Sequence, residues 1–182
     1  MVEEIPFRLL LIMLMISLSV YAASSGLARL AESRAVVGLE SEMDEFVRVG
    51  IAVMASGEGT RVGYTLDLAT GGSVSVESLI IGGDVDDPEG IDDPEFYRFR
   101  LSDGEETPRT LSSGSVLIKA SNRDGEGFPA IRSNGEELIH MVSVECKGGM
   151  MLVLLQETDS FTPSDISEFK AINGCNSGQE GG

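Results

Sequence analysis

The fold of this chain is decided by the stretch LLLIMLMISLSVYAASSGL, residues 9–27, which contains no charged residue. At a rise of 1.5 Å per residue, a helix of this length spans about 28 Å, close to the thickness of a bilayer core. Arg8 precedes the run and Arg29 follows it. A soluble helix would need apolar surroundings on every side of the run, which one small domain does not supply. We therefore predict a membrane helix.

The helical pattern continues beyond this run. Apolar residues recur at intervals of mostly three or four, with charged residues between them, which is typical of an amphipathic helix. Gly26 and Gly38 interrupt the pattern, and each costs about 1 kcal/mol of helix stability. Glycines at 57 and 59 provide the stop signal. One helix is predicted from about Ile5 to about Ala55. Its predicted membrane and packing positions are Leu9, Leu14, Leu18, Leu27, Leu30, Val37, Met43, Phe46 or Val47, Gly50 and Met54.

Two interpretations of the apolar run compete. It resembles a cleaved secretory signal, because Val20-Tyr21-Ala22 has the small-residue pattern that signal peptidases accept. It also suits a retained anchor, because a signal peptide has no need of the amphipathic continuation. We favour the retained, single-pass anchor, with membrane lipid as its partner.

The orientation of the anchor is less sharply defined by charge. Arg8 and the amino terminus lie on one side of the run, and Arg29 and Arg34 lie on the other. This count alone favours a cytoplasmic C-terminal side. Long domains, however, cross membranes largely regardless of charge, and the C-terminal part has the character of an exterior module. We therefore expect an extracellular domain.

From residue 60 onward the apolar period changes from 3.6 to 2, which indicates β-strands. We expect two hairpins, one between the first two strands and one around Lys147-Gly-Gly. The last strand lacks polar alternation, so we expect it to be covered on both faces, one of them by the apolar stripe of the helix. The predicted strands are 62–68, 74–80, 97–101, 115–120, 139–146 and 150–156.

Thr162 and Pro163 begin a short helix, as N-cap and first helical residue. The sequence therefore predicts an α+β fold with a long N-terminal helix and a small antiparallel β-domain. Residues 1–56 form the transmembrane helix and amphipathic stem. Residues 57–172 form the acidic β-domain with its short C-terminal helix, and residues 173–182 form a flexible tail.

Charge narrows the range of partners. Thirty acidic residues face thirteen basic ones, for a net charge of -17. Such a field repels phosphate backbones, so we expect no nucleic-acid partner. The abundance of acids and the scarcity of lysine also fit a high-salt environment.

Catalytic motifs are absent from the sequence. It contains no GxSxG, Walker loop, HExxH or dinucleotide fingerprint, so we expect neither an enzyme nor a cofactor. The lone histidine, His140, shares the apolar parity of its strand with Leu138 and Val142. A satisfied structural histidine is the better interpretation.

An acidic loop is a weak calcium candidate. Asp84, Asp86, Asp92 and Glu95 fall at positions 1, 3, 9 and 12 of a twelve-residue loop. Pro88 stands at position 5, however, and the glycine needed at position 6 is displaced. We favour a solvated acidic loop, with calcium as the alternative.

The two cysteines are predicted to pair. Cys146 ends a strand, and Cys175 follows the short C-terminal helix, which can return the chain to the same end of the sheet. Such a bridge forms in an oxidising exterior. The alternative is a buried thiol at Cys146 and a free thiol in the tail.

An apolar N-terminal helix that runs into an amphipathic stem and a glycine-punctuated β-domain resembles archaeal type IV pilin-like proteins. The phrase Tyr64-Thr-Leu-Asp-Leu68, followed by Gly71-Gly72, is similar to such β-domains. The resemblance implies a filament subunit that packs through its N-terminal helix against other pilin-like subunits. The chain begins MVEEIPFR, with two acids and neither glycine nor alanine, which departs from the family's processing signal. A minor or accessory subunit fits this departure better than a major pilin. The alternative from another class is a secreted or anchored β-rich ligand-binding module.

Overall fold

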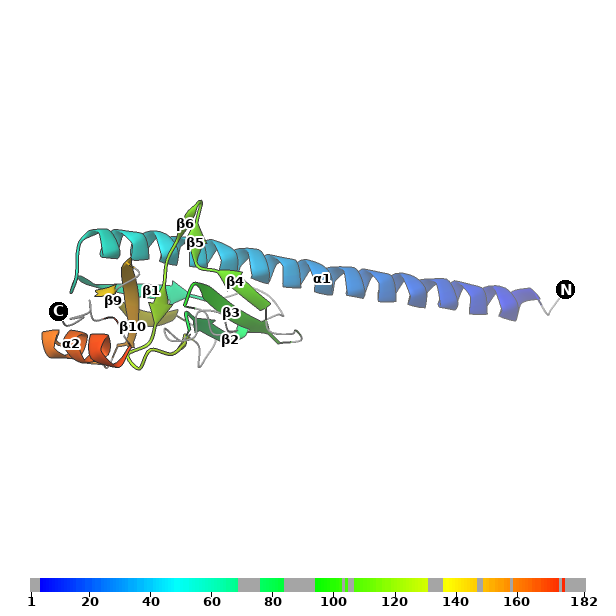
Figure 1. Cartoon of the computed structure of the whole chain (residues 1–182). Helices are drawn as coiled ribbons and strands as arrows, with labels where there is room; N and C mark the ends of the chain where they lie inside the picture. The colour runs from blue at the N-terminus through cyan, green and yellow to red at the C-terminus, as the bar shows by residue number, and fades with distance from the viewer. Residues whose placement is uncertain are drawn as a thin grey trace.

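One long helix, α1 (Glu4–Ala55), organises the molecule. The structure, a computed structural model, describes residues 4–68, 76–83, 94–102, 104, 107–130, 136–146, 149–157, 159–173 and 175. The β-domain packs along the C-terminal half of α1, whereas the N-terminal half projects from it (Figure 1). The helix bounds predicted from the sequence are confirmed to within one residue at each end.

Within the described residues, the β-domain contains two four-stranded sheets. The first has the order β1 (Arg61–Asp67), β9 (Glu136–Cys146), β10 (Gly149–Gln156), β7 (Ala120–Ser121), and only the short β7 runs parallel to its neighbour among these described strands. The second is antiparallel, with the order β4 (Thr107–Thr110), β3 (Phe96–Leu101), β2 (Val76–Ile81), β8 (Phe128–Pro129). A small hairpin joins β5 (Ser112–Ser113) to β6 (Val116–Leu117). The α+β class is confirmed.

The predicted first hairpin is wrong. β1 pairs with β9, with Tyr64 opposite Ile139, and β2 pairs with β3 in the other sheet. Alternation fixes which face of a strand is buried, but it does not fix the partner strand. The hairpin of β9 and β10 is confirmed, although Lys147 and Gly148 of its turn lie outside the described residues.

The predicted strand 115–120 is divided in two. Val116 and Leu117 belong to the small hairpin, whereas Ala120 joins the first sheet beside Leu152. Between them, the Ile118 N–H donates to the Leu111 carbonyl at 2.9 Å and closes the base of the hairpin. Because Ile118 must enter the core while the hairpin leaves it, the chain cannot continue as one strand.

The apolar face of the stem forms one side of the main core. Met43, Phe46 and Val47 are buried there, in one cluster with side chains of both sheets. Gly50 allows the close approach of helix and sheet, because a Cβ at this position would lie 2.6 Å from Leu152 Cδ1. The helix packing expected for Met43 and Phe46 is therefore confirmed. Val37, by contrast, is 62% exposed and lies outside this interface.

Around Val37, the side of α1 that is buried thus differs from the predicted side. Ala35 and Leu39 are the buried residues in this part of the helix, not Val37. Residues 35, 39, 43 and 46 follow the helical spacing of three to four, so they share one side of α1. In the sequence, the small Ala35 was not recognised as part of the apolar stripe, and the larger Val37 was assigned to the stripe instead.

The strand β10 is covered on both faces, as predicted. Leu152 and Leu154 belong to the core under α1. Met151, Val153 and Leu155 belong to a second cluster, which contains Phe169 of α2 (Pro163–Ile172). A strand with helices over both faces needs no polar alternation, which explains its continuous apolar sequence.

The start of α2 is also confirmed. Thr162 is the N-cap and Pro163 begins the helix. The Asp165 carboxylate accepts hydrogen bonds from the Thr162 N–H at 2.5 Å and from the Thr162 hydroxyl at 2.6 Å. These bonds lower the pKa of Asp165.

Substitution of the stem should separate buried from exposed positions. We expect Phe46→Ala to reduce the free energy of unfolding by about 4 kcal/mol, because it opens a cavity in the core. Val37→Ala should change it by less than about 0.5 kcal/mol. Denaturant unfolding of the full chain in detergent, followed by circular dichroism, measures both. Equal losses from the two variants would contradict the packing described here.

Candidate functional site

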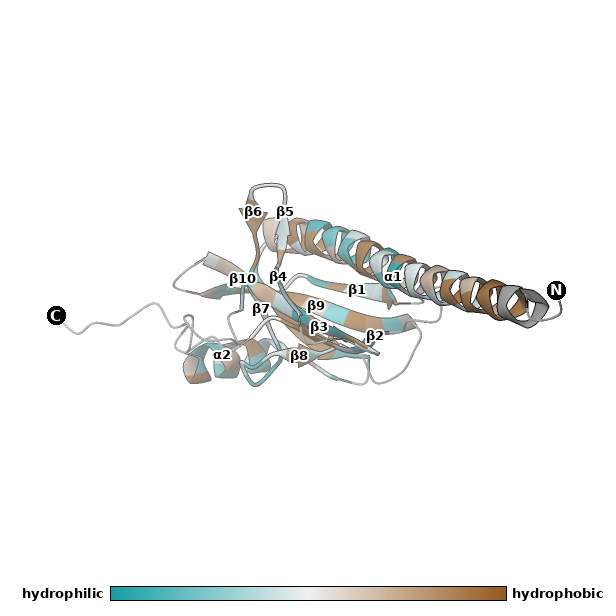
Figure 2. Cartoon of the chain, turned by 90° about the vertical axis from the view of Figure 1, so that its right-hand side faces the viewer, coloured by the Kyte–Doolittle hydropathy of each residue, from teal (hydrophilic) through white to brown (hydrophobic). Residues whose placement is uncertain are grey.

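The N-terminal half of α1 exposes its apolar side chains. From Leu9 to Tyr21 the exposed fractions of its large hydrophobic side chains lie between 44% and 75%. Among the described residues, α1 is one helix near the N-terminus that is long and apolar enough to cross a membrane. A signal sequence meets the same criterion. Figure 2 shows this apolar segment extending beyond the β-domain. Water is a poor solvent for such a surface, whereas lipid suits it.

The serines of this segment are adapted to an apolar solvent. The Ser17 and Ser19 hydroxyls donate to the Met13 and Met15 carbonyls at 2.8 Å. Ser24 and Ser25 make equivalent bonds within the helix, at 2.9 Å and 3.0 Å. Because each hydroxyl finds an acceptor one turn earlier, none of these donors would be left unpaired in an apolar solvent.

The predicted packing positions divide into two groups. Met43, Phe46 and Val47 are buried in the core of the domain, Gly50 is buried beside them, and Met54 packs against the same core. Six positions are exposed: Leu9, Leu14, Leu18, Leu27, Leu30 and Val37. Among the side chains of α1 that the structure describes, Ala35 is the first hydrophobic one that is buried, so the helix between Leu27 and Ala35 forms a neck between the apolar segment and the domain.

Polar contacts fix α1 to both flanks of the domain. Glu42 accepts a hydrogen bond from the Tyr64 hydroxyl at 2.8 Å and another from the Asp67 N–H at 3.2 Å. Burial and the neighbouring Glu42 raise the pKa of Tyr64, so this hydroxyl keeps its proton. On the other flank, Arg109 Nε lies 3.2 Å from Glu40 Oε1. These contacts fix the orientation of the stem about its own axis relative to the sheets.

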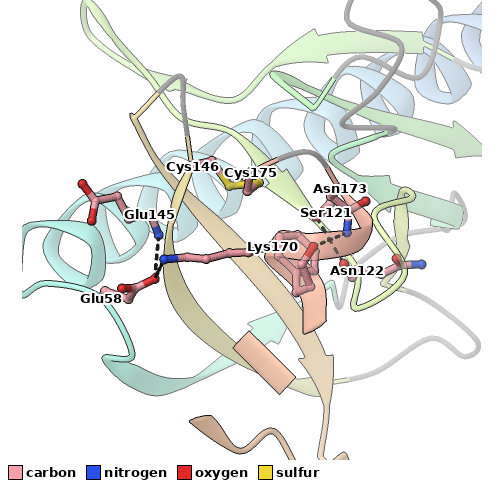
Figure 3. The surroundings of a disulfide bond; sticks show 9 residues. Glu58, Ser121, Asn122, Glu145, Cys146, Lys170, Asn173 and Cys175 are labelled. Atoms are coloured by element: carbon pink, nitrogen blue, oxygen red, sulfur yellow. Dashed lines mark hydrogen bonds and ion pairs between the residues drawn. A yellow bond between two sulfur atoms is a disulfide. The ribbon is translucent and has the colours of Figure 1, made fainter. Parts of the chain in front are cut away.

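The predicted disulfide is present. Cys146 and Cys175 are bonded, with their Cα atoms 4.2 Å apart, and Cys175 is buried (Figure 3). The neighbouring Asn173 is also buried, and its side-chain amide donates to the Phe169 carbonyl at 3.0 Å. Both residues belong to the segment predicted as a flexible tail, so the fixed part of the chain extends to Cys175. Residues 176–182 lie outside the described part.

A second tie lies beside the disulfide. Lys170 of α2 forms an ion pair with Glu58, which follows α1, and the Glu145 N–H donates to the same carboxylate at 3.3 Å (Figure 3). The hydrogen bond from Lys170 lowers the pKa of Glu58. One carboxylate therefore joins the end of α1 to β9 and α2, a contact that sequence patterns do not reveal.

The calcium candidate is only partly described. Asp84, Asp86 and Asp92 lie outside the described residues. Glu95 is described, and its Oε1 lies 3.5 Å from Lys119 Nζ. Within the described ranges, no group of three or more possible metal ligands comes together.

His140 is a structural feature with one unmet requirement. It lies opposite Gly63 of β1 and shares its strand parity with Val142, which is buried. Its Nδ1 is buried, and no described residue forms a hydrogen bond with it. The predicted apolar face is confirmed, but the expected satisfied histidine is not.

The β5–β6 hairpin is a feature that the sequence analysis missed. Leu111 and Ile118 are buried at its base, whereas Val116 and Leu117 are 47% and 52% exposed near its tip. Gly114, at φ 63°, makes the turn. The hairpin passes the flank of α1 and projects beyond it, away from the sheets, in both overall views (Figures 1 and 2). In the sequence, the signal for this hairpin was the pair of neighbouring apolar residues beside a Ser-Gly-Ser turn.

Loss of the disulfide should weaken the C-terminal region. For a loop of 29 residues, the chain-entropy relation predicts that Cys175→Ser lowers the free energy of unfolding by about 3.5 kcal/mol. Denaturing, non-reducing thiol labelling of freshly isolated wild-type protein should find no free thiol. Two reactive thiols would contradict the bridge.

The contribution of the Lys170–Glu58 pair should depend on pH. The folded pKa of Glu58 is lowered, so the pair stabilises the fold above the unfolded value of 4.5 and loses this effect as the pH falls. Since the pair is partly exposed, we expect Lys170→Met to cost about 0.5 kcal/mol at neutral pH.

A double-mutant cycle with Glu58→Gln, measured by denaturant unfolding at several pH values, tests this dependence. The coupling should weaken as the pH falls below 4.5 and disappear once the pH is below the lowered pKa of Glu58 in the folded protein. A coupling of the same size at acidic and neutral pH would show that charge is not responsible.

Comparison with known proteins completes the description of this site. No protein-family model, no curated protein and no solved structure matches the chain. The features of the molecule that bear on its function are therefore the exposed apolar helix, its buried stem, the disulfide and the projecting hairpin.

Proposed function

We propose that this chain is a non-enzymatic, membrane-anchored, pilin-like surface protein. In this proposal it is a minor or accessory subunit of a type IV pilus-like filament or of its assembly system. The apolar half of α1 spans the membrane before assembly, and it packs against other pilin-like subunits within the filament. The β-domain lies outside the cell.

The observation that carries this proposal is that two parts of one helix have opposite burial. The segment Leu9–Leu27 is exposed all round, whereas Met43, Phe46 and Val53 on the same helix are buried in the domain core. A buried stem fixes the direction of the apolar segment relative to the domain. A rigid apolar rod held by a folded head is suited to packing beside copies of itself, first in lipid and then in a bundle.

The disulfide supports the exterior orientation. Cys146 and Cys175 are bonded, and bridges of this kind persist in oxidising compartments. The charge of -17 supports it too, since such a surface stays soluble and stays apart from nucleic acids. Both features agree with an extracellular domain and outweigh the count of basic residues around the run.

One observation favours the alternative, a secreted β-rich binding module. The hydrophobic residues of α1 that are buried in the domain begin at Ala35, so cleavage after Ala22 would leave the core intact. The domain could therefore fold without the apolar segment. The two functions differ in the fate of residues 1–22.

Fractionation separates the two functions. We expect the full-length chain to stay with membranes after carbonate and high-salt washes, because burial of the apolar run in lipid exceeds any surface charge interaction. A portion should co-purify with sheared surface filaments. N-terminal sequencing of each fraction is the deciding measurement. A soluble mature chain that begins at Ala23 would overturn the anchor and support the secreted module.

A further inference from the structure

We propose that the β5–β6 hairpin of one copy docks on the outer side of the stem, at Leu30 and Val37, of a second copy displaced along the helix axis. This inference rests on the proposed assembly and names the surfaces that meet in it.

The hairpin tip is built as a projecting apolar contact. Its base is anchored by Leu111 and Ile118, which are buried and joined by a hydrogen bond. Val116 and Leu117 point to opposite sides of a short strand, and both are exposed, so neither side of the tip is covered by its own domain. A two-stranded hairpin is marginal by itself, and a partner surface would stabilise it.

The tip also lacks charge. Residues 110–118 contain no acidic or basic side chain, although the chain carries a net charge of -17. Two copies of such a protein repel each other wherever their acidic surfaces meet. A neutral, projecting segment is therefore suited to contact a like-charged second copy at short range.

The matching surface is present on the stem of the same protein. Outside residues 9–27, the exposed large hydrophobic residues of the described chain are few: Leu30, Val37, Val62, Val116, Leu117 and Ile172. Leu30 and Val37 are seven residues apart, so they lie on one side of the helix. That side faces away from the domain, because Ala35 and Leu39 occupy the side toward the core.

The hairpin cannot reach this surface on its own stem. A Cβ at Gly50 would lie 3.2 Å from Ile118 Cδ1, which places the hairpin base at the level of Gly50. Val37 and Leu30 lie thirteen and twenty residues earlier, about 20 Å and 30 Å along the helix. A second, parallel copy displaced by this distance brings the two surfaces together.

The displacement determines when the contact forms. Two copies seated at equal depth cannot make the contact, because it needs a displacement of about 20–30 Å along the helix axis. This displacement is close to the thickness of the bilayer core. At equal depth the hairpin base would instead lie at the level of Gly50, near Arg48 and Ala52, which are exposed. The contact therefore belongs to assembled copies, one of which has left the membrane.

Cysteine cross-linking of the full chain in cells tests the contact. We use Leu117→Cys with Val37→Cys, and a short bismaleimide applied to separated filament and membrane fractions. The native cysteines do not compete, because they are bonded to each other. The filament fraction should shift from monomer to dimer and larger bands, and the membrane fraction should stay monomeric. The matched control, Leu117→Cys with Ala52→Cys, should give no dimer.

Three outcomes would overturn the inference. Filaments that contain the chain but show no Leu117–Val37 product refute this contact and leave the proposed function standing. Dimers from the Leu117–Ala52 control refute the displacement. If no filament fraction contains the chain, the proposed function fails and the contact fails with it.

A charge substitution provides an independent measurement. Leu117→Asp should abolish incorporation into filaments while the chain keeps its disulfide and its membrane association. Val62→Asp places the same charge at another exposed apolar position of the domain, and it should assemble normally. Normal assembly of Leu117→Asp would overturn the inference.

Discussion

The structure depends on the burial of one side of the stem against the sheets. Phe46 is the largest fully buried side chain of the stem, and it meets the Tyr64 ring edge to face at 5.7 Å between centroids. Tyr64 in turn reaches Glu42 on the same helix, so an apolar contact and a hydrogen bond hold the same strand. The burial also gives the exposed apolar segment a fixed direction, because it belongs to the same unbroken helix. Without this contact the protein would be an apolar helix and an unrelated β-domain.

The second core follows from the first. Once Leu152 and Leu154 face the stem, the alternate residues of β10 must be covered from the other side. The helix α2 provides this cover through Phe169, and the disulfide and the Lys170–Glu58 pair hold its far end. The stabilising contacts at the C-terminus are thus a consequence of a strand that is apolar on both faces.

Periodicity in the sequence predicted elements better than partners. The helix bounds, β3, the β9–β10 hairpin, the Thr162 cap and the disulfide followed from local patterns and from the end at which each strand finishes. The pairing of β1 with β9 did not, because strand alternation has no information about a partner more than seventy residues away. Val37 was misplaced because the small Ala35 hides the true phase of the stem. At the candidate site, the apolar segment could be recognised in the sequence. The hairpin could not, because it forms only where Ile118 turns back into the core.

The topology also orders the events of folding. The apolar segment is synthesised first and can enter the membrane before any strand exists, whereas β1 must wait for β9 to pair. Until then the buried side of the stem, including Phe46, lacks the sheet that contains Tyr64. The disulfide closes later still, because Cys175 lies 29 residues after Cys146. In the proposed function, an early anchor would keep the unfinished domain at the membrane surface, and its negative charge would limit contact between unfinished copies. The neutral hairpin takes its final form only when Leu111 and Ile118 enter the completed core, so the proposed contact between copies would form only after the domain has folded.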